Sequence, residues 1–191
     1  MKKQFRAAIM LAGALCAGQA YAFDGERRGF VLGLGIGLHS TDIEDNGVPY
    51  SNIARDESPS GLMTSFRIGA GLGKHFLLYY TNDVAWFSEK AEDNLTIAAL
   101  TGIGGAYYFK PQPGGPYLNA AFGWAGRVEL ADSLTDKDYT GTGFSLGVGY
   151  EFRKWLSVEA RYVDMSLEHE TFDVFTKDVS SLQLTFQATF Y

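Results

Sequence analysis

Five segments of this chain alternate between apolar residues and small or polar ones. They cover residues 30–39, 65–72, 143–152, 156–162 and 181–190. A period of two is the period of a β-strand, in which successive side chains point to opposite faces. Each segment therefore predicts a strand with one apolar face. The first segment sets Phe30, Leu32, Leu34, Ile36 and Leu38 against Gly33, Gly35, Gly37 and His39.

Three further segments alternate less regularly, over residues 76–87, 95–109 and 117–129. In the first of them Asn82 falls on the apolar face, whereas Leu77 and Tyr79 fall on the other, so its register is the least certain of the eight. A tilted strand needs about 9–11 residues to cross a bilayer, and segments of this length fit that requirement.

The composition of the second face indicates which way the apolar face points. In a soluble sandwich the face opposite the core is solvated and rich in charged residues. Here that face holds mainly Gly, Ser and Thr with a few charges. The interior of an eight-stranded barrel is only wide enough for side chains, which suits small residues, whereas lipid stabilises large apolar ones outside. The pattern predicts an all-β fold, an eight-stranded antiparallel up-and-down transmembrane β-barrel.

The connections between the predicted strands alternate in length. Short ones cover residues 73–75, 110–116 and 153–154, and longer ones cover 39–61, 88–94, 130–139 and about 166–178. The long connections hold fifteen of the 22 acidic residues, and the short ones hold none. Outer-membrane barrels have short periplasmic turns and longer outside loops. We therefore expect both termini on the periplasmic side and an acidic outer surface that could bind an extracellular ligand.

Aromatic residues fall near both expected membrane interfaces, where amphipathic rings are stabilised at headgroup level. We expect Trp86, Trp124 and Tyr162 at the outer interface. At the periplasmic interface we expect Phe76, Tyr107, Phe109, Tyr117, Phe152, Trp155, Phe190 and Tyr191.

The N-terminus has the organisation of a secretory signal peptide. Lys2, Lys3 and Arg6 precede a short apolar stretch, and Ala20-Tyr21-Ala22 forms a small-x-small cleavage site. We predict a cleaved signal over residues 1–22 and one barrel domain over residues 23–191. Cys16 raises lipid attachment as an alternative, but Leu15 stands where such a site needs a small residue.

Charge and motif content exclude several function classes. Removal of the signal leaves 13 basic residues against 22 acidic ones, a net charge of −9, and so acidic a chain is a poor nucleic-acid partner. A mature chain without cysteine has neither a disulfide nor a thiol nucleophile. We find no phosphate-binding loop, HExxH motif or complete calcium loop, and we expect neither a cofactor nor a metal site.

In its signal peptide, alternating segments, loop pattern and aromatic C-terminus, the chain resembles the small eight-stranded outer-membrane barrels, the OmpA- and OmpX-like group with its opacity-type members. The resemblance implies a bacterial outer-membrane location, contact with lipid and lipopolysaccharide, a monomer, and assembly by machinery that recognises a C-terminal aromatic residue. Apolar residues at every second position precede Phe190, namely Ala188, Phe186, Leu184 and Leu182, whereas polar ones precede Tyr191. We expect Phe190 to carry the signal and Tyr191 to be an added interfacial residue.

Charged residues on the inward face are the buried candidates for chemistry. An unpaired buried charge is costly, so we expect these residues to pair across the lumen. Four of them, Arg67, Asp83, Glu159 and Arg161, fall at similar mid-barrel heights. An alternative is that breaking these pairs gates a narrow conduit. The full set is Arg67, Asp83, Arg127, Glu129, Glu151, Glu159 and Arg161.

The three histidines bear on an enzymatic alternative, because some small outer-membrane barrels modify lipid A. His39, next to Ser40, and His169, between Glu168 and Glu170, could meet at the outer rim, while His75 lies in a periplasmic turn. The His-x-Ser pattern of lipid A deacylases is missing. We expect a non-enzymatic barrel with a structural or surface-interaction role; the alternatives are a low-conductance pore, a lipid A-modifying enzyme and a soluble periplasmic β-protein.

Overall fold

The computed structural model describes residues 27–45, 48–49, 59–89, 94–130, 139–169 and 176–191, so the predicted signal peptide lies outside the described residues. No helix in the described part is long and apolar enough to cross a membrane. The strands are β1 (Arg28–Asp45), β2 (Val48–Pro49), β3 (Ser60–Leu72), β4 (Phe76–Glu89), β5 (Asn94–Tyr108), β6 (Gly115–Leu130), β7 (Tyr139–Arg153), β8 (Leu156–His169) and β9 (Thr176–Phe190).

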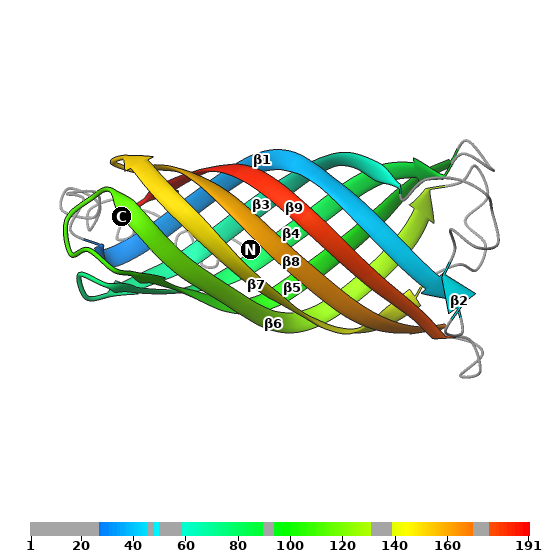
Figure 1. Ribbon diagram of the computed structural model, residues 1–191. Helices are drawn as coiled ribbons and strands as arrows, with labels where there is room; N and C mark the ends of the chain where they lie inside the picture. The colour runs from blue at the N-terminus through cyan, green and yellow to red at the C-terminus, as the bar shows by residue number, and fades with distance from the viewer. Residues whose placement is uncertain (1–26, 46–47, 50–58, 90–93, 131–138, 170–175) are drawn as a thin grey trace, which may run out of the picture.

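Eight long strands form a closed barrel (Figure 1). Each long strand pairs antiparallel with the next along the chain, and β1 also pairs with β9, which closes the wall. The two-residue strand β2 folds back only onto the end of β1. The eight-stranded up-and-down barrel predicted from the alternation is confirmed, with its short turns gathered at one end (Figure 1).

The apolar face of every long strand points outward. Large apolar side chains are exposed all around the wall, and Trp124 reaches 74% exposure. Water would penalise so much apolar surface, at roughly 25 cal/mol per Å², so the wall is suited to lipid. The irregular register of β4 is also as predicted: Leu77 and Tyr79 are buried in the lumen, and outward-facing Asn82 donates to Thr101 Oγ1 of β5 at 2.6 Å.

Several strands extend further at the loop end than the alternation indicated. β1 continues to Asp45 and pairs there with Lys177, so residues expected in loops lie in the wall. The strand ends carry outward-facing acids, because polar side chains replace apolar ones beyond the membrane belt while the backbone ladder continues. At the other end β6 begins at Gly115, inside the segment 110–116 predicted as a turn.

Two apolar clusters fill the lumen on either side of a polar middle. The loop-end cluster contains Phe87, Leu100 and Met165 among its members, and the turn-end cluster contains Leu77, Tyr79 and Tyr108. The alternation indicated a lumen of small and polar residues, so these clusters were not predicted. The apolar residues are tolerated inside because the narrow lumen packs side chain against side chain.

Two aromatic residues expected at the periplasmic interface point into the lumen instead. Tyr117 is 1% exposed and Tyr191 is fully buried, so both interfacial predictions were wrong. Each residue has the parity of the inward positions on its strand, and in a paired strand that parity decides the face. Phe190 faces outward and contacts the Trp155 ring, with 5.6 Å between ring centroids.

Candidate functional site

Four charged side chains meet in the middle of the lumen. Arg67 of β3 forms a bidentate pair with Glu159 of β8, with both N–O distances 2.6 Å. Arg161 of β8 forms a second bidentate pair with Asp83 of β4, at 2.8 and 2.9 Å. Arg161 Nε also lies 3.7 Å from Glu159, which links the two pairs. Since β3 and β4 lie across the lumen from β8, the network ties opposite walls together.

Hydroxyl groups complete this mid-barrel network. Tyr117 of β6 donates to Glu159 Oε1 at 2.5 Å, and Thr81 donates to Asp83 Oδ2 at 3.0 Å. The Tyr117 ring fits because Gly149 on neighbouring β7 has no side chain; a Cβ there would lie 2.2 Å from the ring. Small inward residues therefore make room for a few large ones that span the lumen.

A second ion-pair cluster closes the short-turn end. Glu151 of β7 accepts hydrogen bonds from the Arg27 guanidinium, the Tyr191 hydroxyl, the Gly114 amide at 2.8 Å and the Trp155 amide at 3.3 Å. Burial and the hydrogen bond to Glu151 raise the pKa of Tyr191 well above its usual value. Tyr191 therefore remains a protonated donor, and its hydrogen bond to Glu151 holds its side chain inside the barrel.

Arg27 also hydrogen-bonds to two turns beside this cluster, although the strand alternation did not identify Arg27. Its guanidinium donates to the carbonyl groups of Lys74 (3.3 Å), Lys110 (2.9 Å) and Gln112 (3.2 Å), and it stacks 3.8 Å above the Tyr108 ring centroid. Arg27 precedes β1, so strand alternation did not cover it. Its odd number shares the parity of the inward residues of β1, and extending the alternation backward would have revealed it.

The two remaining predicted inward charges lie on β6, away from both ion-pair clusters. Arg127 is 1% exposed, at a position paired with Ala98 of β5 and Tyr139 of β7. Glu129 pairs by its backbone with Thr96, and its side chain lies outside the described residues. Five of the seven predicted residues thus belong to the two clusters, with Arg27 as the unpredicted partner of Glu151.

At the loop end, the arrangement of His39 argues against a catalytic pair with Ser40. His39 is buried in the lumen, whereas the adjacent Ser40 is exposed on the outer face. His39 Nε2 lies 3.3 Å from the Trp86 carbonyl and must donate to it, so Nδ1 accepts from Thr41 Oγ1 at 2.8 Å. His39 and Ser40 therefore do not meet as the enzymatic alternative would need, because adjacent strand residues face opposite ways.

Of the other two histidines, only His75 has a described side chain, and it does not join this site. His75 lies in the β3–β4 turn at the opposite end, where its Nδ1 is 2.7 Å from the Tyr108 carbonyl. The side chain of His169, at the end of β8, lies outside the described residues. Across the described part of the chain, no three His, Cys, Asp or Glu residues are grouped so as to hold a metal ion.

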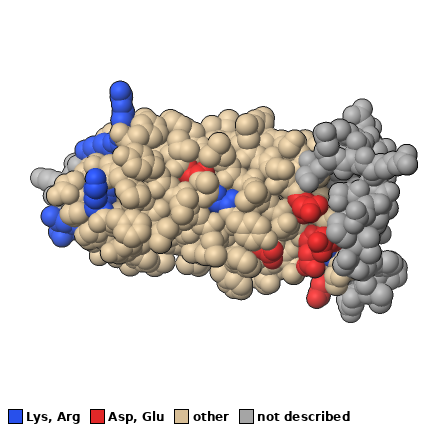
Figure 2. Space-filling view, in the orientation of Figure 1, with Lys and Arg blue, Asp and Glu red and all other residues tan. Residues whose placement is uncertain are grey.

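Basic side chains gather at one end of the barrel and acidic ones at the other, with a few charged atoms visible in the middle of the wall (Figure 2). The short-turn end carries the basic rim, defined as the exposed residues Arg28, Lys74, Lys110, Arg153 and Lys154. The loop end carries the acidic rim, defined as the outward-facing residues Asp42, Glu44, Asp164, Glu168 and Asp178. Opposite charges therefore border the two edges of the apolar belt.

A closed eight-stranded barrel with an apolar exterior and a buried ionic interior defines a transmembrane β-barrel of the outer-membrane class. Solved structures of this class are similar to it. Ail, the attachment invasion locus protein of Yersinia pestis, aligns over 85% of this chain and 99% of its own, at 14% identity and a TM-score of 0.55. Neisserial surface protein A aligns over 83% of this chain and 96% of its own, at 13% identity and a TM-score of 0.55.

Ail has also been solved with a heparin analogue, sucrose octasulfate, and that structure aligns over 85% of this chain and 99% of its own, at 14% identity and a TM-score of 0.52. No protein-family model and no curated protein sequence matches the chain. The similarity therefore establishes the fold, that of the small eight-stranded outer-membrane barrels, and the role must be argued from this chain's own surfaces.

Proposed function

We propose that this protein is a surface-interaction barrel whose acidic rim engages a cationic partner outside the cell. The observation that carries the proposal is the position of the five carboxylates on adjacent strands β8, β9 and β1, beyond the apolar belt. Glu44 and Asp178 are direct cross-strand partners, and Asp42 and Asp164 both pair with Ser180. Like charges placed opposite one another destabilise a sheet, so a role in binding would explain their presence.

The contacts of these carboxylates leave their negative charge in place. Asp178 accepts from Ser166 Oγ at 2.8 Å, and Asp164 accepts from the Tyr162 hydroxyl at 2.9 Å. Hydroxyl donors orient a carboxylate without neutralising it. Five carboxylates with Lys177 beside them leave the described rim with an excess of negative charge, which attracts basic peptides and protein surfaces and accelerates their association.

Because the acidic rim is negative, its proposed partner is opposite in charge to the ligand found with one structural neighbour. Ail was solved with sucrose octasulfate, a polyanion. An acidic rim would repel such a ligand, because like-charge juxtaposition opposes binding. The same fold would therefore serve partners of opposite charge through different rims.

The proposal is tested by binding an oligolysine peptide to the barrel in neutral-lipid nanodiscs. We expect affinity to fall as salt rises, and to fall several-fold when Glu44→Gln and Asp178→Asn are combined. The matched control, Ser40→Asn with Ser60→Asn, changes an exposed cross-strand pair of β1 and β3 at the same end without changing its charge, and should bind as the native protein does. Equal affinity for the native protein and the neutralised variant would contradict the proposal.

A low-conductance pore is the second candidate, and buried polar atoms favour it. Among the described residues, Asn119 Nδ2, Gln183 Oε1 and both polar side-chain atoms of Gln187 face the lumen without a protein hydrogen-bond partner. Such atoms suit a hydrated path past the mid-barrel network. In planar bilayers we expect little conductance from the native protein and more when Arg67 or Glu159 is neutralised; channels unaffected by both changes would exclude gating by this network.

The proposal also includes two further points. The barrel contacts lipopolysaccharide, and it has no enzymatic activity. His39 and Ser40 point to opposite sides of the wall, which supports a non-enzymatic role. Unchanged lipid A acylation after incubation of the purified barrel with lipopolysaccharide would agree with this, whereas altered acylation would establish the enzymatic alternative.

We further propose that Phe190, with Phe186 and Leu184 at alternate positions before it, is the signal for the barrel assembly machinery. All three face outward, where such machinery can reach them, whereas Tyr191 is buried. Loss of outer-membrane yield in Phe190→Ala but not in Tyr191→Ala would support the assignment. The reverse result would move the signal to Tyr191.

A further inference from the structure

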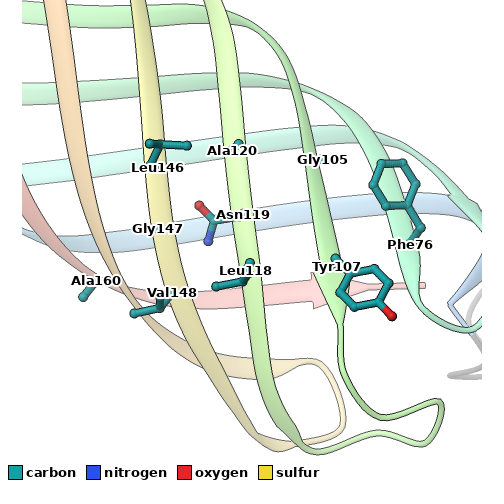
Figure 3. Close-up of a pocket in the computed structure, with 10 residues that line it drawn as sticks. All are labelled: Phe76, Gly105, Tyr107, Leu118, Asn119, Ala120, Leu146, Gly147, Val148 and Ala160. Atoms are coloured by element: carbon teal, nitrogen blue, oxygen red, sulfur yellow. The ribbon is translucent and has the colours of Figure 1, made fainter.

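A shallow apolar groove of about 700 Å³ lies on the lipid-facing wall near the short turns (Figure 3). Its small lining residues are Gly105, Ala120 and Ala160, and larger neighbours such as Phe76, Tyr107 and Leu118 flank them. Small residues between large ones on a lipid-facing surface leave a depression. A lipid fills this depression only if its acyl chain matches the shape of the depression.

The strand register explains the depression. Gly105 and Ala120 are direct cross-strand partners on β5 and β6, so two small residues lie side by side. In the next outward-facing row toward the short turns, Tyr107 of β5 is the cross-strand partner of Phe76 of β4 and of Leu118 of β6. These three large side chains form the raised edge beside Gly105 and Ala120. Leu146 of β7 is the next partner of Ala120, and Ala160 of β8 is a small residue at the far end of the Tyr107 row, beside Val148. An apolar chain laid across these strands would contact side chains on both of its sides.

Two lysines of the basic rim lie in the turns that adjoin the β4–β5 end of the groove. Lys74 precedes Phe76 by two residues and Lys110 follows Tyr107 by three, and both side chains are exposed. The two turns lie together, because Arg27 Nη1 donates to the carbonyl groups of both Lys74 and Lys110. His75 stacks on the Tyr107 ring, with 5.9 Å between centroids, so an amphipathic aromatic pair stands between the lysines and the groove.

We propose that this groove binds an anionic phospholipid of the periplasmic leaflet. Its phosphate lies at Lys74 and Lys110, and one acyl chain lies over Gly105 and Ala120. The charges are complementary, and the apolar groove begins where the basic rim ends, which is the order of headgroup and chain in a phospholipid. The short turns face the periplasm in barrels of this class, so the occupant comes from the inner leaflet.

Barrel strands tilt by about 35–45° from the membrane normal, which sets the direction of the groove. A row of cross-strand partners therefore climbs from the rim at Phe76 of β4 to the middle of the wall at Ala160 of β8. The acyl chain over Gly105 and Ala120 would lie alongside this row, on its side away from the short turns, and would run obliquely into the apolar belt. The turn between β7 and β8, with Arg153 and Lys154, joins the strands at the other end of the groove, where Val148 and Ala160 lie, and gives an internal comparison for the two lysines at the β4–β5 end.

The test uses native mass spectrometry of the folded barrel from micelles that contain equal amounts of phosphatidylglycerol and phosphatidylethanolamine. We expect the native protein to retain phosphatidylglycerol preferentially. Each lysine near an anionic headgroup contributes about fivefold in affinity, so Lys74→Gln with Lys110→Gln should lower retention more than tenfold. The matched charge control, Arg153→Gln with Lys154→Gln, should retain the lipid.

A second variant tests the groove itself. Ala120→Phe fills the depression from the lipid-facing side, where added bulk does not disturb the lumen, and should abolish preferential retention. Its control, Ala99→Phe, adds the same bulk on β5, about 20 Å along the strand from Gly105. Equal retention by Ala120→Phe and Ala99→Phe, or equal losses from the two lysine pairs, would overturn the proposal. Heat-modifiable gel migration verifies that each variant is folded, and none of these residues belongs to the acidic rim.

Discussion

The half of the lumen at the short-turn end, called the charged half, is stabilised mainly by ion pairs, whereas the half at the loop end, called the apolar half, is stabilised mainly by apolar packing. The charged half contains the Arg27–Glu151 cluster and the mid-barrel network, whose side chains each need particular partners, together with the turn-end apolar cluster. In the apolar half at the loop end, the cluster that contains Phe87, Leu100 and Met165 needs mainly the right volume. A buried ion pair is costly to break, whereas an apolar contact can be rearranged. The two halves should therefore respond differently to substitutions of similar size.

The largest effect should come from Glu159→Gln, which removes one charge but almost no volume. Arg67 loses its bidentate partner while it remains buried, and Tyr117 loses a charged acceptor. Breaking one side of a buried pair costs about 3–5 kcal/mol. Urea unfolding in lipid vesicles measures this loss. The double variant Arg67→Met, Glu159→Leu removes both charges and should be destabilised less; a double variant as unstable as Glu159→Gln would show that the pair is not the cause.

The next effect should come from Tyr191→Phe at the turn end. The substitution removes only the hydroxyl that donates to Glu151, and a hydrogen bond to a charged group contributes about 1.5–3 kcal/mol. Glu151 keeps Arg27 and two backbone amides, so the loss should be smaller than that of Glu159→Gln. The same unfolding measurement compares them. A Tyr191→Phe variant as stable as the native protein would mean that the C-terminal residue does not fasten the cluster.

In the apolar half, Met165→Leu should have a smaller effect still. It keeps volume and polarity among the neighbours of the loop-end cluster, and such exchanges cost less than about 1.5 kcal/mol. The free energy of unfolding of this variant, set beside that of Glu159→Gln, tests the comparison directly. A loss as large as 3 kcal/mol would show that the apolar half is as demanding as the charged half.

The alternation predicted the wall and its inward charges because a closed antiparallel barrel gives every residue one of two faces. It placed Arg67, Asp83, Glu159 and Arg161 at similar heights, but it did not predict which of them form each pair, nor the partners of Glu151, because contacts across the lumen depend on the stagger of the closed wall. Glu151 shows this: its partner Arg27 lies before the first strand, and its donor Tyr191 was assigned to the membrane interface by its position near the chain end. The apolar lumen clusters were missed because Leu100 and Phe87 lie on the strands with the least regular alternation.

The smallest effect, and the only stabilising one, should come from the outside of the loop end. Glu44→Gln removes one of two like charges that face each other across β1 and β9, where Asp178 is the partner. Relief of such a pair is worth about 0.2–1 kcal/mol. Because both side chains face outward, the gain should shrink as salt screens the charges. Unfolding at low and high salt measures it. A gain that is independent of salt would point to packing instead of repulsion, and would weaken the case that the acidic rim is maintained for binding at some cost in stability.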